Sequence, residues 1–306
     1  MNLRDLRYFI ALAETRHFGQ AATRSFVSQP TLSGQIRKLE AELGVALFER
    51  TTKAVALTPL GEALLPHARR TVEEADALAQ LAKAHRDPLM GPLRVGAIPT
   101  LAPYLVPLIL APLKRRYPGL KLVLTEEITA QLLERLHRHA IDTALIATPV
   151  EDAELKVRVL FEEPFWVALP RRHPLVHKDP ITRRDLDSLD MLLLSEGHCL
   201  AQQTMDICRL ADRKDSGEHA DLRATSLETL LQLVGAQMGA TLVPALALRG
   251  AWTTDAGVIA RPLQAPGAYR RISLIWRKSF PRTAAIEAFA EVIVSSLPNT
   301  VRVPGR

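Results

Sequence analysis

Residues 26–43 read FVSQPTLSGQIRKLEAEL, and this stretch decides the fold of the N-terminal part of the chain. Ser28 is a favourable residue for capping a helix, and Pro30 is tolerated because it falls in the first turn. Apolar side chains then recur at helical spacing up to Gly44, a residue type that commonly ends a helix. The pattern predicts a helix over residues 29–43.

Two shorter helical patterns precede this helix. Residues 3–14 carry one apolar stripe, and residues 18–25 form a second pattern in which the small Ala21 and Ala22 allow close crossing of another helix. A tight connection at residues 26–28 follows. Helix, short turn and helix is the helix-turn-helix arrangement, whose second helix enters the major groove of DNA.

The helix over residues 29–43 has a polar face suited to DNA. Leu32, Ile36, Leu39 and Leu43 are expected to face inward, which leaves short hydrogen-bonding groups and cations outside. Such groups suit base edges and phosphates, although an ordinary solvated helix face has a similar composition. The candidate DNA-binding residues on this helix are Ser28, Gln29, Pro30, Thr31, Ser33, Gln35, Arg37 and Lys38.

Two further elements follow in this part of the chain. Residues 46–57 predict a β-hairpin with a cationic tip, a wing on which Arg50 and Lys53 are placed to reach phosphate. Residues 59–85 predict a long helix with an apolar seam near heptad spacing. A long helix of this kind usually pairs with a copy of itself, so we expect a dimer, and packing within the chain is the alternative.

A set of short motifs carries a family resemblance over residues 1–60. The motifs are LRYF at 6–9, SQPTLS at 28–33, IRKLE at 36–40, LG at 43–44 and LFER at 47–50. Together they resemble the winged helix-turn-helix of LysR-type transcriptional regulators. The resemblance implies a regulator that binds double-stranded promoter DNA as a dimer or tetramer, with RNA polymerase as a partner.

The composition agrees with a globular protein of two or three domains. The chain has 306 residues, of which 47% are hydrophobic and 24% charged, and its net charge of +6 permits nucleic-acid binding. We find no run of about 18 apolar residues and no signal-peptide core, so we expect a cytoplasmic protein without a membrane span. In that reducing compartment a static structural disulfide is not expected.

Beyond a break rich in Pro and Gly at residues 87–92, strands and helices alternate, which predicts an α/β fold with a mostly parallel sheet. Strands are expected near residues 93–98, 120–125, 143–147, 165–169, 191–194, 224, 240–243 and 272–276, with helices at 105–117 and 130–140. The family resemblance implies two α/β subdomains of periplasmic-binding-protein type. We therefore expect a DNA-binding domain at 1–58, a linker helix at 59–87 and a regulatory domain at 88–306, with subdomain I at 91–163 and 269–297 and subdomain II at 164–268.

Cys199 and Cys208 are the only cysteines, and they lie in one short segment that is predicted to be helical. Nine residues of helix rise by about 13.5 Å and place the two side chains on opposite faces. Because a disulfide needs Cα atoms within about 7 Å, the two thiols can join only if the helix unwinds. The simpler alternative is that both are small buried side chains. A zinc site with His198 fits no usual ligand spacing and lacks a fourth ligand.

Three motifs narrow the resemblance to a peroxide-sensing branch of the LysR family: SEGHCL at 195–200, Cys208, and RATSLETL at 223–230. The resemblance implies that peroxide oxidises Cys199 to a sulfenic acid and that Cys208 then forms a disulfide with it. The resulting change in oligomer geometry would activate antioxidant genes. The implied peroxide-binding residues are Thr100, Thr129, His198 and Cys199, the implied assembly is a dimer of dimers, and the implied reductant is glutaredoxin or thioredoxin. No metal, cofactor or enzymatic activity is expected.

The chemistry of a peroxide sensor needs a thiolate, because only the thiolate attacks the O–O bond. Cys199 is predicted at the start of a helix, so we expect the helix amides and a protonated His198 to lower its pKa. Thr100 and Thr129 follow strands, where their hydroxyls can point into a cleft or simply cap helices. An arginine is expected to hold the segment, and the sequence does not choose between Arg270 and Arg271.

Two other functions remain compatible with these residues. A regulator of the same fold could respond to a small metabolite bound between the two subdomains, with the cysteines serving only in packing. A thiol peroxidase is the alternative from another class of protein, and the helix-turn-helix with its basic wing argues against it.

Overall fold

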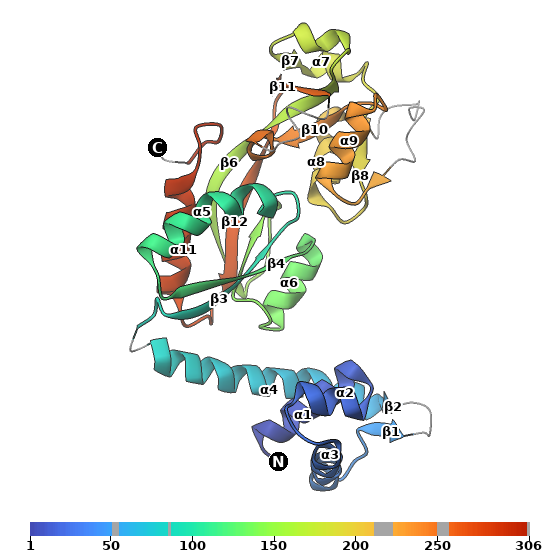
Figure 1. Ribbon diagram of the computed structural model, residues 1–306, viewed down its shortest axis with the longest axis vertical. Coiled ribbons are helices and arrows are strands. Elements are labelled where there is room, and N and C mark those ends of the chain that lie inside the picture. Colours follow the sequence, from blue (N-terminus) through green and yellow to red (C-terminus); the bar gives the residue numbers. More distant parts are fainter. Residues whose placement is uncertain (51–54, 85–86, 211–222, 250–256, 305–306) are drawn as a thin grey trace. The chain divides into compact units, whose positions relative to one another are not determined.

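The computed structural model describes residues 1–50, 55–84, 87–210, 223–249 and 257–304 (Figure 1). The chain divides into two units, Met1–Arg86 and Asp87–Arg306. The described residues of the first unit form one hydrophobic core, and those of the second form two.

The first unit contains the expected three helices and wing. Its elements are α1 (Leu3–Thr15), α2 (Phe18–Arg24), α3 (Gln29–Leu43), β1 (Phe48–Arg50), β2 (Val55–Leu57) and α4 (Pro59–Ala84). The Ser28 hydroxyl accepts a hydrogen bond from the Thr31 amide at 3.3 Å, and Gly44 ends α3 in the left-handed conformation with φ 70°. The predicted bounds and caps of the third helix are therefore confirmed. The core of this unit packs Phe9, Leu12, Leu32, Ile36 and Leu39, each at most 1% exposed. The expectation that Leu43 faces inward is wrong, because this last residue of α3 is 38% exposed.

The wing and the long helix are also present. Strands β1 and β2 pair antiparallel, with Phe48 opposite Leu57. Lys53 and the side chain of Arg50 lie outside the described residues. On α4, Leu60 and Leu78 are 45% and 72% exposed, so the described residues leave part of its apolar seam uncovered.

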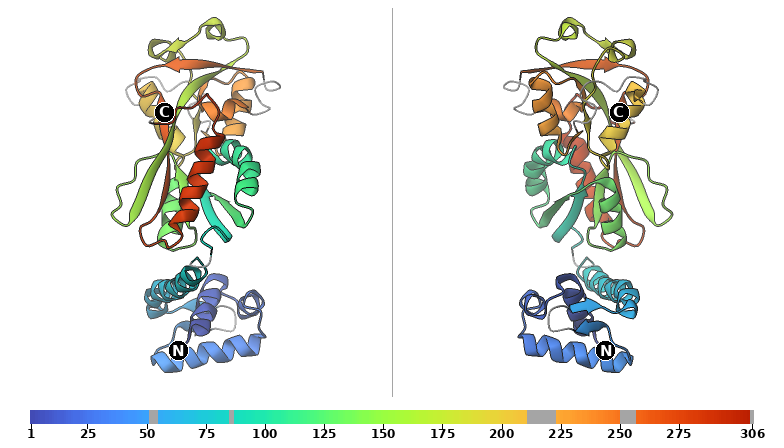
Figure 2. Two further views of the ribbon diagram at one scale, coloured as in Figure 1. Left: turned by 90° about the vertical axis from the view of Figure 1, so that its left-hand side faces the viewer. Right: turned by 90° about the vertical axis from the view of Figure 1, so that its right-hand side faces the viewer.

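The second unit begins with a parallel sheet. Strands β3 (Gly91–Ala97), β4 (Leu120–Glu126) and β5 (Thr143–Ile146) are parallel, with β3 in the centre. Helices α5 (Ala102–Arg116) and α11 (Thr283–Ser296) lie on one face and α6 (Thr129–His137) lies on the other (Figures 1 and 2). The carboxyl ends of parallel strands in such a sheet are the usual place for a site.

Two long strands connect this sheet to the rest of the unit. The first half of β6 (Leu155–Pro170) pairs antiparallel with β12 (Tyr269–Arg277), and its second half pairs antiparallel with β10 (Thr241–Pro244) and β11 (Val258–Gln264). The expectation of a mostly parallel sheet is therefore wrong. The sheet is mixed, because its two longest strands run antiparallel to their neighbours.

Short elements complete the second unit. They are η1 (Pro174–His177), β7 (Ile181–Thr182), α7 (Arg183–Leu186), β8 (Leu193–Leu194), α8 (Cys199–Cys208), β9 (Arg223–Ala224), α9 (Leu227–Gly235) and η3 (Ala245–Arg249). Strands β8 and β9 are parallel and lead into α8 and α9 respectively.

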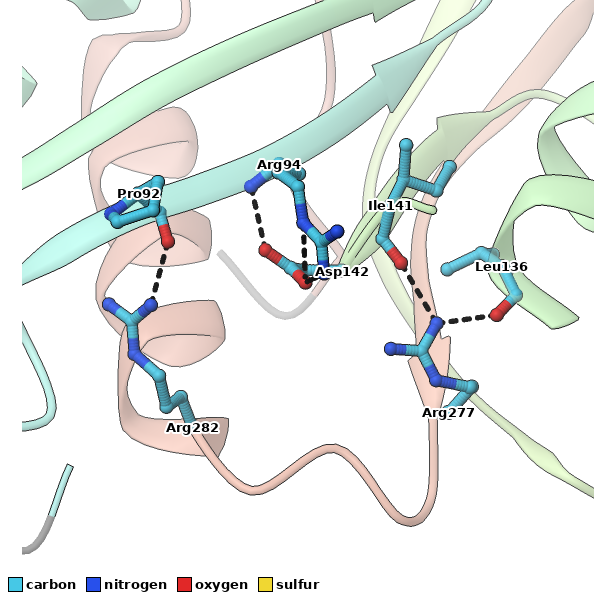
Figure 3. Close-up of polar contacts among 7 residues, drawn as sticks. All are labelled: Pro92, Arg94, Leu136, Ile141, Asp142, Arg277 and Arg282. Carbon is cyan, nitrogen blue, oxygen red and sulfur yellow. Dashed lines mark hydrogen bonds and ion pairs between the residues drawn. The ribbon is translucent and has the colours of Figure 1, made fainter. Parts of the chain in front are cut away.

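Hydrogen bonds of charged side chains stabilise the edge of the first sheet at which β3 and β5 begin (Figure 3). The Asp142 carboxylate accepts hydrogen bonds from the backbone N–H and the Nη2 of Arg94, both at 2.8 Å. Arg277 Nη1 donates to the carbonyls of Leu136 and Ile141. These contacts leave the opposite, carboxyl edge for the residues that bear the candidate site.

The described part of the chain lacks both a membrane-spanning helix and a cluster of metal ligands. None of its helices has the length and hydropathy that crossing a bilayer requires. No group of three or more His, Cys, Asp or Glu side chains within it is arranged to hold a metal ion.

Candidate functional site

Cys199 is the first residue of α8, at the point where a tight turn leaves β8. Gly197 has φ 92°, a left-handed conformation that suits glycine, and a side chain there would also press against Ile128 at 3.0 Å. Cys199 is half-buried as a residue, and its side chain packs against the core of the first sheet. The sequence prediction that this segment is helical is confirmed.

Arg270 is the buried centre of the site. Its Nε donates to Glu163 Oε2 at 2.9 Å, its Nη1 to the Thr100 hydroxyl at 2.8 Å, and its Nη2 to the Thr100 carbonyl at 3.0 Å. Glu163 Oε1 accepts from the Leu246 amide at 2.7 Å. The structure thus selects Arg270 over Arg271, which is exposed and paired with Glu162. Because Arg270 and Glu163 lie on β12 and β6, their ion pair joins the two long strands.

The two threonines occupy different settings. Thr100 is buried and engaged by Arg270, whereas the buried Thr129 hydroxyl oxygen has no hydrogen-bond partner among the described residues. The N-cap positions of α5 and α6 are Leu101 and Ile128, and neither helix has a side-chain cap. Helix capping therefore does not account for either threonine. Thr129 comes directly after Ile128, which meets the turn at Gly197.

The electrostatics of Cys199 differ from the sequence expectation. Burial raises the pKa of the Cys199 thiol, while the charge of Arg270 and hydrogen bonds from the Leu200 and Cys199 amides act to lower it. Burial also lowers the pKa of His198, which keeps this imidazole neutral near pH 7. The helix amides lower the pKa of Cys199 as expected. The expectations of a net lowering of that pKa and of a protonated His198 are wrong. Loss of hydration outweighs the attractive groups, and sequence does not report hydration.

Cys208 lies at the other end of the same helix in a different environment. Its side chain is 1% exposed and belongs to the core of the second sheet, together with Leu200. Neither cysteine is in a disulfide. Nine residues of intact helix separate them by a rise of about 13.5 Å, so a bond between them requires α8 to unwind.

Two hydrogen bonds between side chains and distant elements join the parts of this unit around the site. Gln203 Nε2, one turn after Cys199, donates to the Ala147 carbonyl at the end of β5 at 2.8 Å. The Tyr104 hydroxyl on α5 donates to Glu228 Oε1 on α9 at 2.6 Å. Burial, together with the hydrogen bond to Glu228, raises the pKa of Tyr104, so the phenol stays protonated.

Sequence reasoning missed the roles of Glu163 and Gln203. For Glu163, the sequence indicates only that the first stretch of subdomain I ends there. A signal was available for each residue. Glu163 alternates with Phe161 and Phe165 at the spacing of one strand face, where a buried carboxylate needs a cation. Gln203 lies four residues after Cys199 on the same helical face.

The first unit presents its candidate DNA-binding residues on α3. Ser28, Gln29, Pro30 and Thr31 at the helix start are exposed, as are Arg37 and Lys38 further along. Ser33 and Gln35 are half-buried, and Gln35 Oε1 is shielded without a hydrogen-bond partner among the described residues. These two are therefore less accessible than the sequence pattern predicts.

Comparison with known families and proteins identifies both units. Residues 3–62 match the family of bacterial regulatory helix-turn-helix proteins, lysR family, and residues 86–298 match the LysR substrate binding domain. The hydrogen peroxide-inducible genes activator of Pectobacterium carotovorum subsp. carotovorum is 42% identical over 96% of this chain and 96% of its own length. The DNA-binding transcriptional dual regulator OxyR of Escherichia coli K12 is 42% identical over 96% of this chain and 95% of its own.

Solved structures give the same result. A full-length OxyR variant from Pseudomonas aeruginosa superposes with a TM-score of 0.77 at 38% identity, covering 99% of this chain and 100% of that one. A mutant of Corynebacterium glutamicum OxyR with hydrogen peroxide bound gives 0.66 at 40% identity, covering 96% and 92%. The chain belongs to the LysR family of bacterial helix-turn-helix regulators, in the branch that contains OxyR.

Proposed function

We propose that this protein is a transcriptional regulator that senses hydrogen peroxide through Cys199 and Cys208. One observation carries the proposal: the two cysteines stand at opposite ends of one helix and are packed in separate cores. A disulfide between them is incompatible with that helix, so forming it must change the structure of the segment. The similarity to hydrogen peroxide-inducible activators over nearly the whole chain supports peroxide as the oxidant.

The first chemical step is attack of the Cys199 thiolate on one oxygen of hydrogen peroxide. An S–O bond forms, the O–O bond breaks, and the departing hydroxide takes up a proton to become water. The thiol must first lose its own proton, and the neutral His198 next to it is a suitable acceptor. The Thr100 and Thr129 hydroxyls would hold the peroxide, with Thr100 fixed by Arg270.

The second step uses Cys208. Its thiolate attacks the sulfur of the Cys199 sulfenic acid, an S–S bond forms, and the hydroxyl leaves as water once it is protonated. Helix α8 must unwind to allow this, which withdraws Leu200 and Cys208 from the second core. A dithiol reductant of the glutaredoxin or thioredoxin kind restores both thiols.

We propose that the first unit reads promoter DNA. Its interface comprises the exposed residues of α3 and the wing formed by β1 and β2, and α4 pairs with its copy through the uncovered apolar seam. The same proposal includes the domain division at residues 58 and 87 and a dimer of dimers. It also includes contact with RNA polymerase and activation of antioxidant genes.

Thiol-labelling mass spectrometry after one equivalent of hydrogen peroxide, with a footprint on promoter DNA, tests the proposal. A Cys199–Cys208 disulfide together with an altered footprint is expected. Cys199→Ser should abolish both, and Cys208→Ser should still form the sulfenic acid without a lasting footprint change. Cysteines that stay reduced with an unchanged footprint would overturn the proposal in favour of a small-metabolite effector.

A further inference from the structure

Phe26 combines two unfavourable features at the turn of the helix-turn-helix. Its side chain is 95% exposed, the largest exposed fraction of any large hydrophobic residue in the described part of the chain. Its backbone is left-handed, with φ 55°, a conformation that is costly for residues with a Cβ. Among the described residues, no packing contact accounts for an aromatic side chain at this position.

The local hydrogen bonds explain why the backbone is left-handed here. The Phe26 amide donates to the Thr23 carbonyl at 3.1 Å and the Val27 amide to the Ala22 carbonyl at 3.0 Å. This is the Schellman pattern, which ends α2 and turns the chain into α3. Glycine is the usual residue at the left-handed position of this motif, and the chain does use glycine where α3 ends, at Gly44.

The position of Phe26 indicates what its ring could contact. It lies two residues before Ser28, which caps α3, and its exposed neighbours Gln29, Pro30 and Thr31 form the start of that helix. The N-terminal end of the second helix is the part of a helix-turn-helix that approaches base edges and the adjacent backbone. A ring at this turn is therefore continuous with the surface that faces DNA.

We infer that Phe26 is a DNA-contacting residue whose ring packs on the apolar surface of the duplex, formed by thymine methyl groups and deoxyribose. The inference rests on the proposed DNA binding by α3 and extends it to a residue outside the polar set. Binding removes the exposed ring from water, which offsets the cost of an aromatic residue in the left-handed conformation.

Phe26→Gly is the informative variant, because it relieves the backbone cost and removes the ring together. We expect the melting temperature of the DNA-free protein to rise by roughly 2–6 °C, while affinity for promoter DNA falls by about fivefold or more. Because the lost contact is apolar, the slope of affinity against salt concentration should not change. Phe26→Leu should retain most of the affinity.

Gln237→Gly provides a matched control. Gln237 is exposed, has φ 67° and occupies the same left-handed position after α9, with its amide bonded to the Val234 carbonyl and the Met238 amide to the Leu233 carbonyl. This variant should gain stability with unchanged DNA affinity. DNA probes with uracil in place of thymine then distinguish thymine methyl groups from deoxyribose as the surface that Phe26 contacts. These probes lack the methyl groups and keep the sugars, so affinity falls only if the ring contacts a methyl group.

The outcomes separate this inference from the function on which it rests. If the wild-type protein binds no promoter DNA, the proposed function itself is wrong. Wild-type binding with equal affinity in Phe26→Gly would overturn only the role of Phe26, as would a shallower salt slope. A change in sedimentation without a change in DNA affinity would also overturn it, because the ring would then contact another protein.

Discussion

Arg270 binds Thr100 twice, through Nη1 to the hydroxyl at 2.8 Å and through Nη2 to the carbonyl at 3.0 Å. Both ends of the threonine are thereby fixed, and the guanidinium that fixes them also acts electrostatically on Cys199. The same side chain therefore positions a hydroxyl of the proposed peroxide site and favours the thiolate that attacks. A neighbouring arginine on the same strand makes this role testable.

Arg270→Gln should slow oxidation of Cys199 by peroxide roughly tenfold or more, because a charge-assisted hydrogen bond and a nearby positive charge are lost together. The variant also leaves Glu163 buried without its cation, so the free energy of unfolding should fall by about 3–5 kcal/mol. Rapid-quench thiol labelling measures the rate and denaturant unfolding measures the stability.

Arg271→Gln is the control for this prediction. Arg271 is exposed and pairs with Glu162, so its loss should change neither the rate nor the stability measurably. Arg270→Lys is a second variant for the case that Arg270→Gln folds poorly. It keeps the positive charge, so its rate of Cys199 oxidation should lie between the rate of the wild type and the rate expected for Arg270→Gln. Equal rates for the wild type and both Arg270 variants would remove Arg270 from the sensing step.

The pH dependence of Cys199 follows from its buried thiol. Burial raises the pKa of this group above its ordinary value of 9.0, so alkylation of Cys199 should accelerate about tenfold per pH unit between pH 7 and 9 without a plateau. Iodoacetamide labelling of the Cys208→Ser variant measures Cys199 alone. A plateau below pH 8 would show that the thiolate is already formed near neutrality.

The same pKa change has a consequence for stability. A thiol whose pKa is raised by folding contributes stability that is fully present below the pKa of the unfolded chain. That contribution is lost as the pH rises through the higher pKa of the folded state. We therefore expect the unfolding free energy of the wild type to fall relative to that of Cys199→Ser above about pH 9.

The elements that sequence predicted well have local causes. Helix α3 begins and ends where Ser28 and Gly44 allow, since caps depend on a few neighbouring residues. The apolar pattern predicts strand β6 only over residues 165–169, although the strand runs over Leu155–Pro170. Its charged residues and Pro164 interrupt the apolar pattern, and its two halves pair with different strands, which sequence does not reveal.

The site shows the same division. The cysteines and their helix follow from the sequence pattern, whereas Thr100 and Thr129 stay a prediction that the family resemblance implies. The partner of Glu163 does not, because Arg270 is 107 residues away and only the pairing of β6 with β12 brings them together. Burial of Cys199 and His198 likewise depends on the packing of distant elements, so the expected lowering of the Cys199 pKa and the protonated state of His198 were wrong.

Arg282 holds the entry of the chain into the second unit (Figure 3). Its side chain is buried and donates to the carbonyls of Pro88, Met90 and Pro92 at 3.2, 2.7 and 2.7 Å. Arg282→Gln should lower the unfolding free energy of this unit by about 2–4 kcal/mol, because the charge-assisted hydrogen bonds of a buried guanidinium are lost. Arg138→Gln, which removes an exposed pair with Glu134, should have little effect in the same denaturant titration.

Gln203 holds α8 in its helical form by bonding across to Ala147 at 2.8 Å. Gln203→Leu removes this tether and should let the segment unwind more easily. A neutral hydrogen bond contributes about 0.5–1.5 kcal/mol, so disulfide formation should accelerate by roughly twofold to tenfold. The rate of sulfenic acid formation, measured separately in a Cys208→Ser background, should stay the same.

Gln202→Leu is the matched control, since Gln202 lies on the same helix, is exposed and bonds only locally, to Asp206 at 2.7 Å. It should leave both steps unchanged. Equal acceleration by the two variants would mean that helix propensity, not the tether, sets the rate. A slower first step in Gln203→Leu would instead place this amide in the reaction with peroxide, and would contradict a role confined to holding α8.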